Sequence, residues 1–282
     1  MRVVLYSRTE VPHFSALAEG CRATGHTVVW QRPSHFKTNE LVKNADAVVI
    51  PGIQFVNAKI LSAYKPLGVQ VWITDLPRLR LESAMGFYLD TVHWVPKEGY
   101  RKPVVHGLIK DRKPEVALVC GQVPNDIAHG MPANAWDEWA RTTVRRTKEV
   151  TGLPVVYRQH PVYKAPLPPD GFGADAISDS DSETLYQAMK NVAVLVCHNS
   201  TCGWEAIDAG VPVFATATGE NRPGYDEYAL KSLEHITALP KAKRTEALAR
   251  VASTQWTLDE LRNGEAAGKM FGLQYVEELK IA

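Results

Sequence analysis

The sequence predicts an α/β protein made of two consecutive, doubly wound Rossmann-like domains with a helical C-terminal segment. Short apolar runs alternate with amphipathic stretches along the first half, and a second alternating series begins near residue 115. Such alternation is typical of parallel sheets with crossover helices. A length of 282 residues is sufficient for two domains, each with its own hydrophobic core.

The first alternating series occupies residues 1–113. A basic stretch bounded by Pro103 and Pro114 follows it and has the composition of a linker. We therefore expect a first domain over residues 1–113 and a second over residues 114–282. The predicted strands of the first domain are residues 3–7, 27–30, 47–51, 69–74 and 91–95, and its predicted helices are residues 14–24, 39–45, 57–64 and 82–88.

The second series continues the same pattern. Ser180 and Glu183 have the spacing of a capping box, which predicts a helix that ends at residue 192. From residue 225 onward the pattern is mostly helical. These elements predict a pair of domains that face a cleft. The remaining elements expected here are strands over residues 116–120, 154–158, 194–197 and 211–214 and a helix over residues 135–150.

Composition restricts the class of protein. No apolar run approaches the length of a membrane span, and no signal peptide is expected. Four cysteines without CxxC spacing predict a reduced, cytoplasmic protein. Residues 1–113 hold 16 Lys and Arg against 9 Asp and Glu, whereas the other residues hold 16 against 22. The basic part favours an anionic partner such as nucleic acid, and scattered surface charge without a partner is the alternative.

Residues 194–214 are the most informative segment for function. They predict a buried strand, a polar turn at which Ser200 or Thr201 caps a helix, and a second strand after Gly210. The N–H groups and the positive dipole end of such a helix form an anion site, which suits a diphosphate. Gly203 would let a ligand approach the backbone, and Glu205 would reach ribose hydroxyls. An ordinary βαβ turn without a ligand is the alternative.

Polar residues lie at the carboxyl ends of three predicted strands of the second domain, where ligands of open α/β sheets bind. Gly121 and Gln122 follow one strand, Arg158 and His160 lie at the end of the next, and His198 follows the third. An arginine fork matches phosphate oxygens, and a histidine adds a hydrogen bond or a charge. We expect the three tips to converge on one crevice. A surface arginine beside a core histidine is the alternative.

Three motifs occur in order: Gly121-Gln122-Val-Pro-x-Asp126, Arg158-x-His160-Pro161, and His198-Asn-Ser-Thr-x-Gly-x-Glu205-Ala-x-x-Ala-Gly-Val-Pro-Val. Over residues 115–216 they resemble glycosyltransferases of the GT-B fold, and within that fold the bacterial capsular polysaccharide Kdo transferases and related bacteriophage glycosyltransferases. One position departs from the family pattern, because Gln159 stands where the pattern has proline. The resemblance therefore leaves the donor nucleobase open.

The resemblance implies an enzyme that moves a sugar from a nucleotide-sugar donor to a hydroxyl acceptor, and we expect a UDP-linked donor rather than a CMP-linked one. It implies no bound metal and no cofactor beyond this cosubstrate. By the same resemblance, the ribose is bound by Glu205 and the diphosphate by His198, Asn199, Ser200 and Thr201.

An inverting transfer needs a general base for the acceptor hydroxyl. In the fold that the sequence resembles, this base belongs to the strand tips of the first domain. Asp75, directly after the strand at residues 69–74, is the first choice, and Glu10 and His13, in the loop after the first strand, come next. A capping or surface role is the alternative for each of them, and a retaining transfer would need no such base.

The favoured acceptor is a hydroxymethylated pyrimidine in double-stranded phage DNA, because the first domain is basic and the resemblance includes phage enzymes. Arg78 and Arg80, just past Asp75, are the predicted phosphate contacts. This acceptor would place the protein in the cytoplasm of a phage host. Three alternatives stay open: a capsular or cell-surface polysaccharide glycosyltransferase with a CMP-Kdo-like donor, a UDP-sugar 2-epimerase, and a sugar-nucleotide-binding protein.

Overall fold

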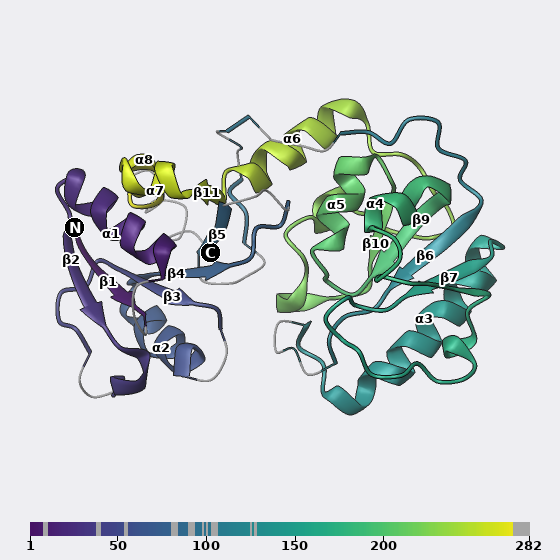
Figure 1. The fold of residues 1–282 in the computed structure, drawn as a ribbon, viewed down its shortest axis with the longest axis horizontal. Coiled ribbons are helices and arrows are strands. Elements are labelled where there is room, and N and C mark those ends of the chain that lie inside the picture. Colours follow the sequence, from purple (N-terminus) through teal and green to yellow (C-terminus); the bar gives the residue numbers. More distant parts are fainter. Residues whose placement is uncertain are drawn as a thin grey trace. The chain divides into compact units, whose positions relative to one another are not determined.

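The computed structural model of the chain forms two units (Figure 1). Unit 1 consists of Met1–Val95 and the segment that begins at Thr254, and unit 2 consists of Pro96–Ser253. Within the described part of the chain, no helix has both the length and the apolar character needed to cross a membrane. The structure describes residues 1–7, 11–37, 41–53, 56–79, 84–89, 94–97, 99, 101–102, 107–124, 126 and 129–272.

Unit 1 contains a six-stranded sheet in the order β11-β5-β4-β3-β1-β2. Four strands of it pair in parallel, and they confirm the predicted strands at residues 3–7, 27–30, 47–51 and 69–74. These strands are mostly continuous apolar runs because helices cover both faces of the sheet. Their bounds are β1 (Arg2–Tyr6), β2 (Thr27–Gln31), β3 (Ala47–Pro51) and β4 (Gln70–Asp75).

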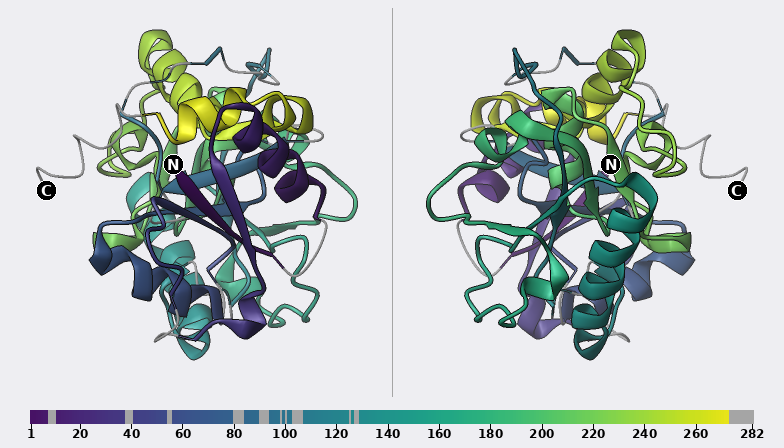
Figure 2. Two further views of the ribbon diagram at one scale, coloured as in Figure 1. Left: turned by 90° about the vertical axis from the view of Figure 1, so that its left-hand side faces the viewer. Right: turned by 90° about the vertical axis from the view of Figure 1, so that its right-hand side faces the viewer.

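Helices pack on both faces of this sheet. α1 (Pro12–Ala23), α7 (Leu258–Arg262) and α8 (Glu265–Met270) lie on one face, and α2 (Val56–Tyr64) lies on the other (Figure 1). The first face buries a core to which α1, α7 and α8 all contribute. Figure 2 also shows α7 and α8 beside α1, and an ion pair of 3.2 Å joins Arg262 to Glu19 there.

The chain returns to unit 1 after Ser253. β11 (Gln255–Thr257) pairs antiparallel with β5 (Ala84–Leu89), and Trp256 enters the unit 1 core with 1% of its surface exposed. The division expected at residue 113, with all later residues in the second domain, therefore differs from this arrangement. An amphipathic pattern shows that α7 and α8 have an apolar face, but it does not show which core buries that face.

Strand β5 replaces the helix predicted over residues 82–88, so that prediction is wrong. Its apolar sequence contains no helical or alternating period, and antiparallel pairing with both β4 and β11 makes it a strand. The helix predicted over residues 39–45 is absent from the described residues 41–45. The strand predicted over residues 91–95 lies partly outside the described residues, and Trp94 and Val95 are not in a strand.

Unit 2 contains a five-stranded sheet in the order β10-β9-β6-β7-β8, with every pair of neighbours parallel. Four of these strands were predicted, with small differences at their ends. β8 was not, because it has only three residues and its Ile177 is exposed. The bounds are β6 (Val116–Cys120), β7 (Val155–Arg158), β8 (Ala176–Ser178), β9 (Val192–Cys197) and β10 (Val213–Ala215).

α3 (Trp136–Thr151) packs on one face of this sheet, and α4 (Leu185–Ala188) and α5 (Cys202–Ala209) lie on the other (Figure 1). α6 (Lys241–Ala252) packs against α5. Asp208 of α5 is fully buried, accepts a hydrogen bond from Tyr186 of α4, and lies 3.1 Å from the Arg244 guanidinium of α6. These contacts fix α5, whose N-terminus lies at the edge of the sheet.

Trp256→Ala should destabilise unit 1 by about 3–5 kcal/mol, because it removes a large side chain from a closed core. Hydrogen exchange should accelerate in β1, β3 and β4, with little change in β6 and β9. Trp30→Ala is the matched control, since Trp30 is 38% exposed on β2. Faster exchange in β6 and β9 instead would mean that the segment after Thr254 stabilises unit 2.

Candidate functional site

The carboxyl ends of β6 and β9 are the point at which the chain changes direction across the unit 2 sheet. β7 and β8 lie on one side of β6, and β9 and β10 lie on the other. Open α/β sheets bind ligands at such a switch point. Gln122 and Asn199 bridge it: Gln122 Nε2 donates to Asn199 Oδ1 at 3.0 Å, and the Asn199 N–H donates to Gln122 Oε1 at 3.1 Å. Two of the predicted donor-binding residues are therefore in contact.

Asn199 and His198 both have protein partners at this point. Asn199 Nδ2 donates to the carbonyl oxygen of Asn221 at 3.1 Å. The His198 ring is buried, with Nδ1 2.9 Å from Thr216 Oγ1 and Nε2 3.1 Å from the carbonyl oxygen of His129. Burial lowers the pKa of His198. The described polar contacts of both side chains are with protein, so their diphosphate contacts stay a prediction.

The sequence carries no signal for the partners of His198. Trp139 Nε1 donates to Thr216 Oγ1 at 2.9 Å, and Trp139 stacks on Trp136 with 4.3 Å between ring centroids. His129 is completely buried in the loop after β6. These residues come from the helix α3, the end of β10 and a loop, and no spacing pattern connects them.

Three buried cysteines show how closely the strand tips approach one another. Cys120 ends β6, Cys197 ends β9 and Cys202 begins α5. Hydrogen bonds from Cys120 and Cys197 lower the pKa of the Cys202 thiol. The tips of β6 and β9 and the N-terminus of α5 thus meet at one place. Within the described ranges, no group of His, Cys, Asp and Glu side chains has the arrangement of a metal site.

The ring of His160, which follows β7, has a defined orientation. Its Nδ1 accepts the N–H of Val162 at 3.2 Å. In the neutral imidazole the proton then resides on Nε2, which makes this nitrogen a donor.

Helix α5 begins beside the buried cysteines without a strong side-chain cap. Thr201 is the N-cap residue and its side chain makes no capping bond, whereas Ser200 Oγ accepts the Cys202 N–H at 3.3 Å. Among the described residues, the N–H group of Thr201 donates to no protein acceptor, whereas the N–H group of Ser200 bonds the Cys197 thiol. A free N–H group at the positive end of a helix favours an anion. Glu205 lies in the first turn of this helix, as predicted, and is 8% exposed.

Gly203 and Gly121 make room for tyrosine rings. A Cβ on Gly203 would lie 2.2 Å from Cζ of Tyr225, and one on Gly121 would lie 2.3 Å from Oη of Tyr157. Tyr225 Oη also donates to the carbonyl oxygen of Ser200 at 2.8 Å and so supports the turn before α5. The expectation that Gly203 admits a ligand to the backbone is corrected, because a side chain of the protein occupies that space.

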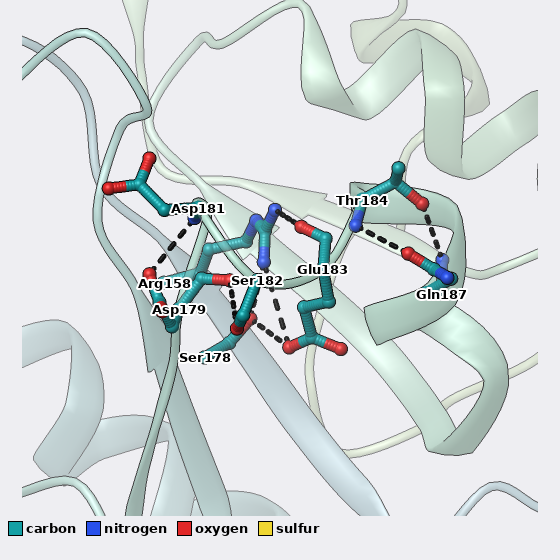
Figure 3. Close-up of polar contacts among 8 residues, drawn as sticks. All are labelled: Arg158, Ser178, Asp179, Asp181, Ser182, Glu183, Thr184 and Gln187. Atoms are coloured by element: carbon teal, nitrogen blue, oxygen red, sulfur yellow. Dashed lines mark hydrogen bonds and ion pairs between the residues drawn. The ribbon is translucent and has the colours of Figure 1, made fainter.

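Figure 3 shows that Arg158 turns toward the residues that follow β8. Its guanidinium donates to Ser178 Oγ at 2.5 Å and to the carbonyl oxygen of Glu183 at 2.7 Å, and only 7% of its surface is exposed. The Glu183 carboxylate lies 3.7 Å from the guanidinium and accepts the Ser178 hydroxyl at 2.6 Å. The charge of Arg158 is compensated within the protein, so a phosphate contact would require another side-chain position.

The start of α4 differs from the prediction. Thr184 and Gln187 form its capping box: the Gln187 N–H donates to Thr184 Oγ1 at 3.2 Å, and the Thr184 N–H donates to Gln187 Oε1 at 2.7 Å (Figure 3). The box predicted at Ser180 and Glu183 is therefore wrong by four residues. Both pairs have the required spacing, and Glu183 is held by Arg158 instead.

The switch point of the unit 1 sheet lies between β1 and β3. Ser7 follows β1 and His13 lies in the first turn of α1, and among the described residues the buried atoms Ser7 Oγ and His13 Nε2 have no hydrogen-bond partner. Such atoms cost free energy that a bound polar group can recover. Asp75 is the exposed last residue of β4, and one carboxylate oxygen accepts the Leu76 N–H at 2.7 Å. Glu10 lies outside the described residues.

Arg78 is only 3% exposed, and its guanidinium lies 4.4 Å from the centroid of the Tyr88 ring. A guanidinium packed on an aromatic ring inside the protein does not reach out to the phosphates of a duplex. The structure therefore does not support the predicted DNA contact of Arg78. Arg80 lies outside the described residues.

Comparison with known proteins identifies the fold. No protein-family model and no curated protein matches the chain. The solved β-Kdo 2,7-transferase of Thermosulfurimonas dismutans KpsC is similar, with a TM-score of 0.54 and 14% identity over 95% of this chain and 100% of that one. The β-Kdo 2,4-transferase of the same protein has a TM-score of 0.48 and 14% identity over 88% and 90% of the two chains. The chain has the GT-B fold, as predicted, with two Rossmann-like sheets.

His198→Gln should weaken the dependence of the free energy of unfolding on pH. Because burial lowers the pKa of His198 in the folded protein, the unfolded chain binds a proton that the folded chain excludes once the pH falls below about 6.5. Stability is then lost by up to about 1.4 kcal/mol per pH unit for this group. Urea unfolding between pH 7 and pH 5 measures the slope, and the exposed His235, replaced by Gln, is the control. An unchanged slope in His198→Gln would contradict the burial argument.

Proposed function

We propose that the protein is a glycosyltransferase that binds a nucleotide sugar at the carboxyl edge of the unit 2 sheet and transfers the sugar to a hydroxyl acceptor. The observation that carries this proposal is the bridge of Gln122 and Asn199 at the switch point between β6 and β9, directly before the N-terminus of α5. The likeness of the fold to a Kdo transferase supports the same class of reaction.

The proposed donor site stabilises the leaving group. As the glycosidic bond breaks, negative charge develops on the nucleoside phosphate, and fixed donors that point at this charge lower the barrier. The Thr201 N–H group, the Ser200 and Thr201 hydroxyl groups and the His160 ring are proposed as such donors. Glu205, one turn along α5, is proposed to accept hydrogen bonds from the ribose. A UDP-linked sugar is the proposed donor, on the motif that runs from His198 to Glu205.

The acceptor and the general base are proposed for the carboxyl edge of the unit 1 sheet. The buried polar atoms of Ser7 and His13, which have no partner within the described part of the chain, support a polar ligand there. Asp75 remains the first choice for the base because its carboxylate is exposed at a strand tip, and His13 is the second. A carboxylate or an imidazole at this position would take the proton from the acceptor hydroxyl as it attacks the sugar.

The acceptor class decides between the candidate functions. With Arg78 buried, the proposal of a hydroxymethylated DNA acceptor rests on the net charge of residues 1–113. The protein should be incubated with UDP- and CMP-sugars and with one of three acceptors: hydroxymethylated duplex DNA, an anionic oligosaccharide or a neutral one. Mass spectrometry would identify the sugar and the acceptor together. Conversion of the nucleotide sugar into its epimer without any acceptor would refute transfer and identify an epimerase.

Glu205→Gln and Asp75→Asn should affect different kinetic constants. The neutral amide of Glu205→Gln accepts hydrogen bonds from the ribose more weakly than the carboxylate does, and this should raise the KM for the donor about tenfold with little change in kcat. Loss of the base in Asp75→Asn should lower kcat about 100-fold or more while the affinity for UDP stays the same. His13→Gln is the parallel test of the second candidate. If Asp75→Asn keeps full activity, Asp75 is not the base.

A further inference from the structure

The hydrogen bonds around His198 have a single consistent direction. The carbonyl oxygen of His129 can only accept, so His198 Nε2 must carry a proton to bond it at 3.1 Å. In the neutral ring Nδ1 then accepts from the Thr216 hydroxyl at 2.9 Å. The same hydroxyl oxygen accepts the Trp139 indole N–H at 2.9 Å. Each donor therefore has an acceptor along the chain of hydrogen bonds that runs from the Trp139 indole to the carbonyl oxygen of His129.

The second histidine closes the loop that follows β6. His129 Nε2 lies 3.0 Å from the carbonyl oxygen of Val123 and 3.1 Å from that of Pro124, and its Nδ1 accepts the Met131 N–H at 3.0 Å. The ring therefore joins the two ends of this loop. Because His198 bonds the backbone of His129, it ties the closed loop to β9.

The position of this loop matters for the donor site because Gln122 lies at its start. The Gln122 amide is bonded to both the side chain and the N–H of Asn199. Asn199 directly precedes the turn at Ser200 and Thr201 that leads into α5. A displaced loop would move the Gln122 amide away from Asn199 and change the geometry of that turn.

We propose that His198 is a positioning residue. Through its neutral Nε2–H form it holds His129 in place, and with it Gln122–Pro124 at the start of the loop after β6, and the Thr216 hydroxyl stabilises this form by donating to Nδ1. In this role His198 acts through the carbonyl group of His129 and not by contact with phosphate. The inference rests on the proposed function only for its effect on donor binding, because the loop contact itself exists without a substrate.

The first test measures the loop without any substrate. Thr216→Val removes the hydroxyl that bonds Nδ1 and should accelerate backbone hydrogen exchange in the loop after β6 about tenfold. Thr216→Ser keeps the hydroxyl and should exchange like the wild type, and exchange in α6 serves as the internal reference. Exchange in Thr216→Val equal to the wild type would overturn the proposal.

The second test separates positioning from phosphate contact. Gln at position 198 is neutral but can still donate to His129 and accept from Thr216, whereas Ala can do neither. His198→Gln should keep the affinity for UDP, measured by calorimetry, within about twofold of the wild type, and His198→Ala should lose about tenfold. Equal losses in both variants would assign His198 to the phosphate and overturn the proposal.

Nitrogen NMR of the wild-type protein measures the tautomer of the His198 imidazole directly, without any variant. The proposal expects His198 Nε2 protonated and Nδ1 unprotonated at neutral pH, and the opposite tautomer would overturn it. If the protein binds UDP but transfers no sugar, the proposed function fails, while the exchange and NMR results still decide the role of His198.

Discussion

The amide pair of Gln122 and Asn199 joins the two strands between which the unit 2 chain reverses its direction across the sheet. Parallel strands bring all their carboxyl ends to one edge, and the reversal separates the loops that leave β6 and β9. The bridge between these loops fixes the turn before α5. This turn leads into Thr201 and Cys202, at which α5 begins, so the start of that helix depends on this one junction.

The parts of the fold that could be predicted are those whose signal lies within the segment itself. β3 and β6 are continuous apolar runs because helices bury both faces of a parallel sheet, and the sequence shows them directly. β5 and β11 are strands because they pair with each other across more than 160 residues, and neither segment has a pattern of its own. β8 is held by β7 in the same way.

The candidate site shows the same limit at the level of side chains. The sequence places Arg158, His160 and His198 at strand tips, and the structure brings those tips together. It does not show that Arg158 turns to Ser178 and Glu183, or that His198 bonds a residue 69 positions earlier. The side chains of Arg158 and His198 adopt these orientations because acceptor groups on other elements bind their N–H donors. A sequence motif therefore predicts where the backbone of a site lies more reliably than it predicts which hydrogen bonds its side chains make.

The path of the chain between the two units has a consequence for synthesis on the ribosome. Unit 2 is one uninterrupted stretch, Pro96–Ser253, whereas the unit 1 sheet needs β11 and its core needs Trp256. Synthesis of unit 1 therefore begins before that of unit 2 but ends after it. Until β11 emerges, β5 presents an unpaired edge to other nascent or newly released chains, and such edges promote aggregation. Expression yield should therefore depend on how quickly residues from Thr254 onward become available, a demand on chaperones that unit 2 does not share.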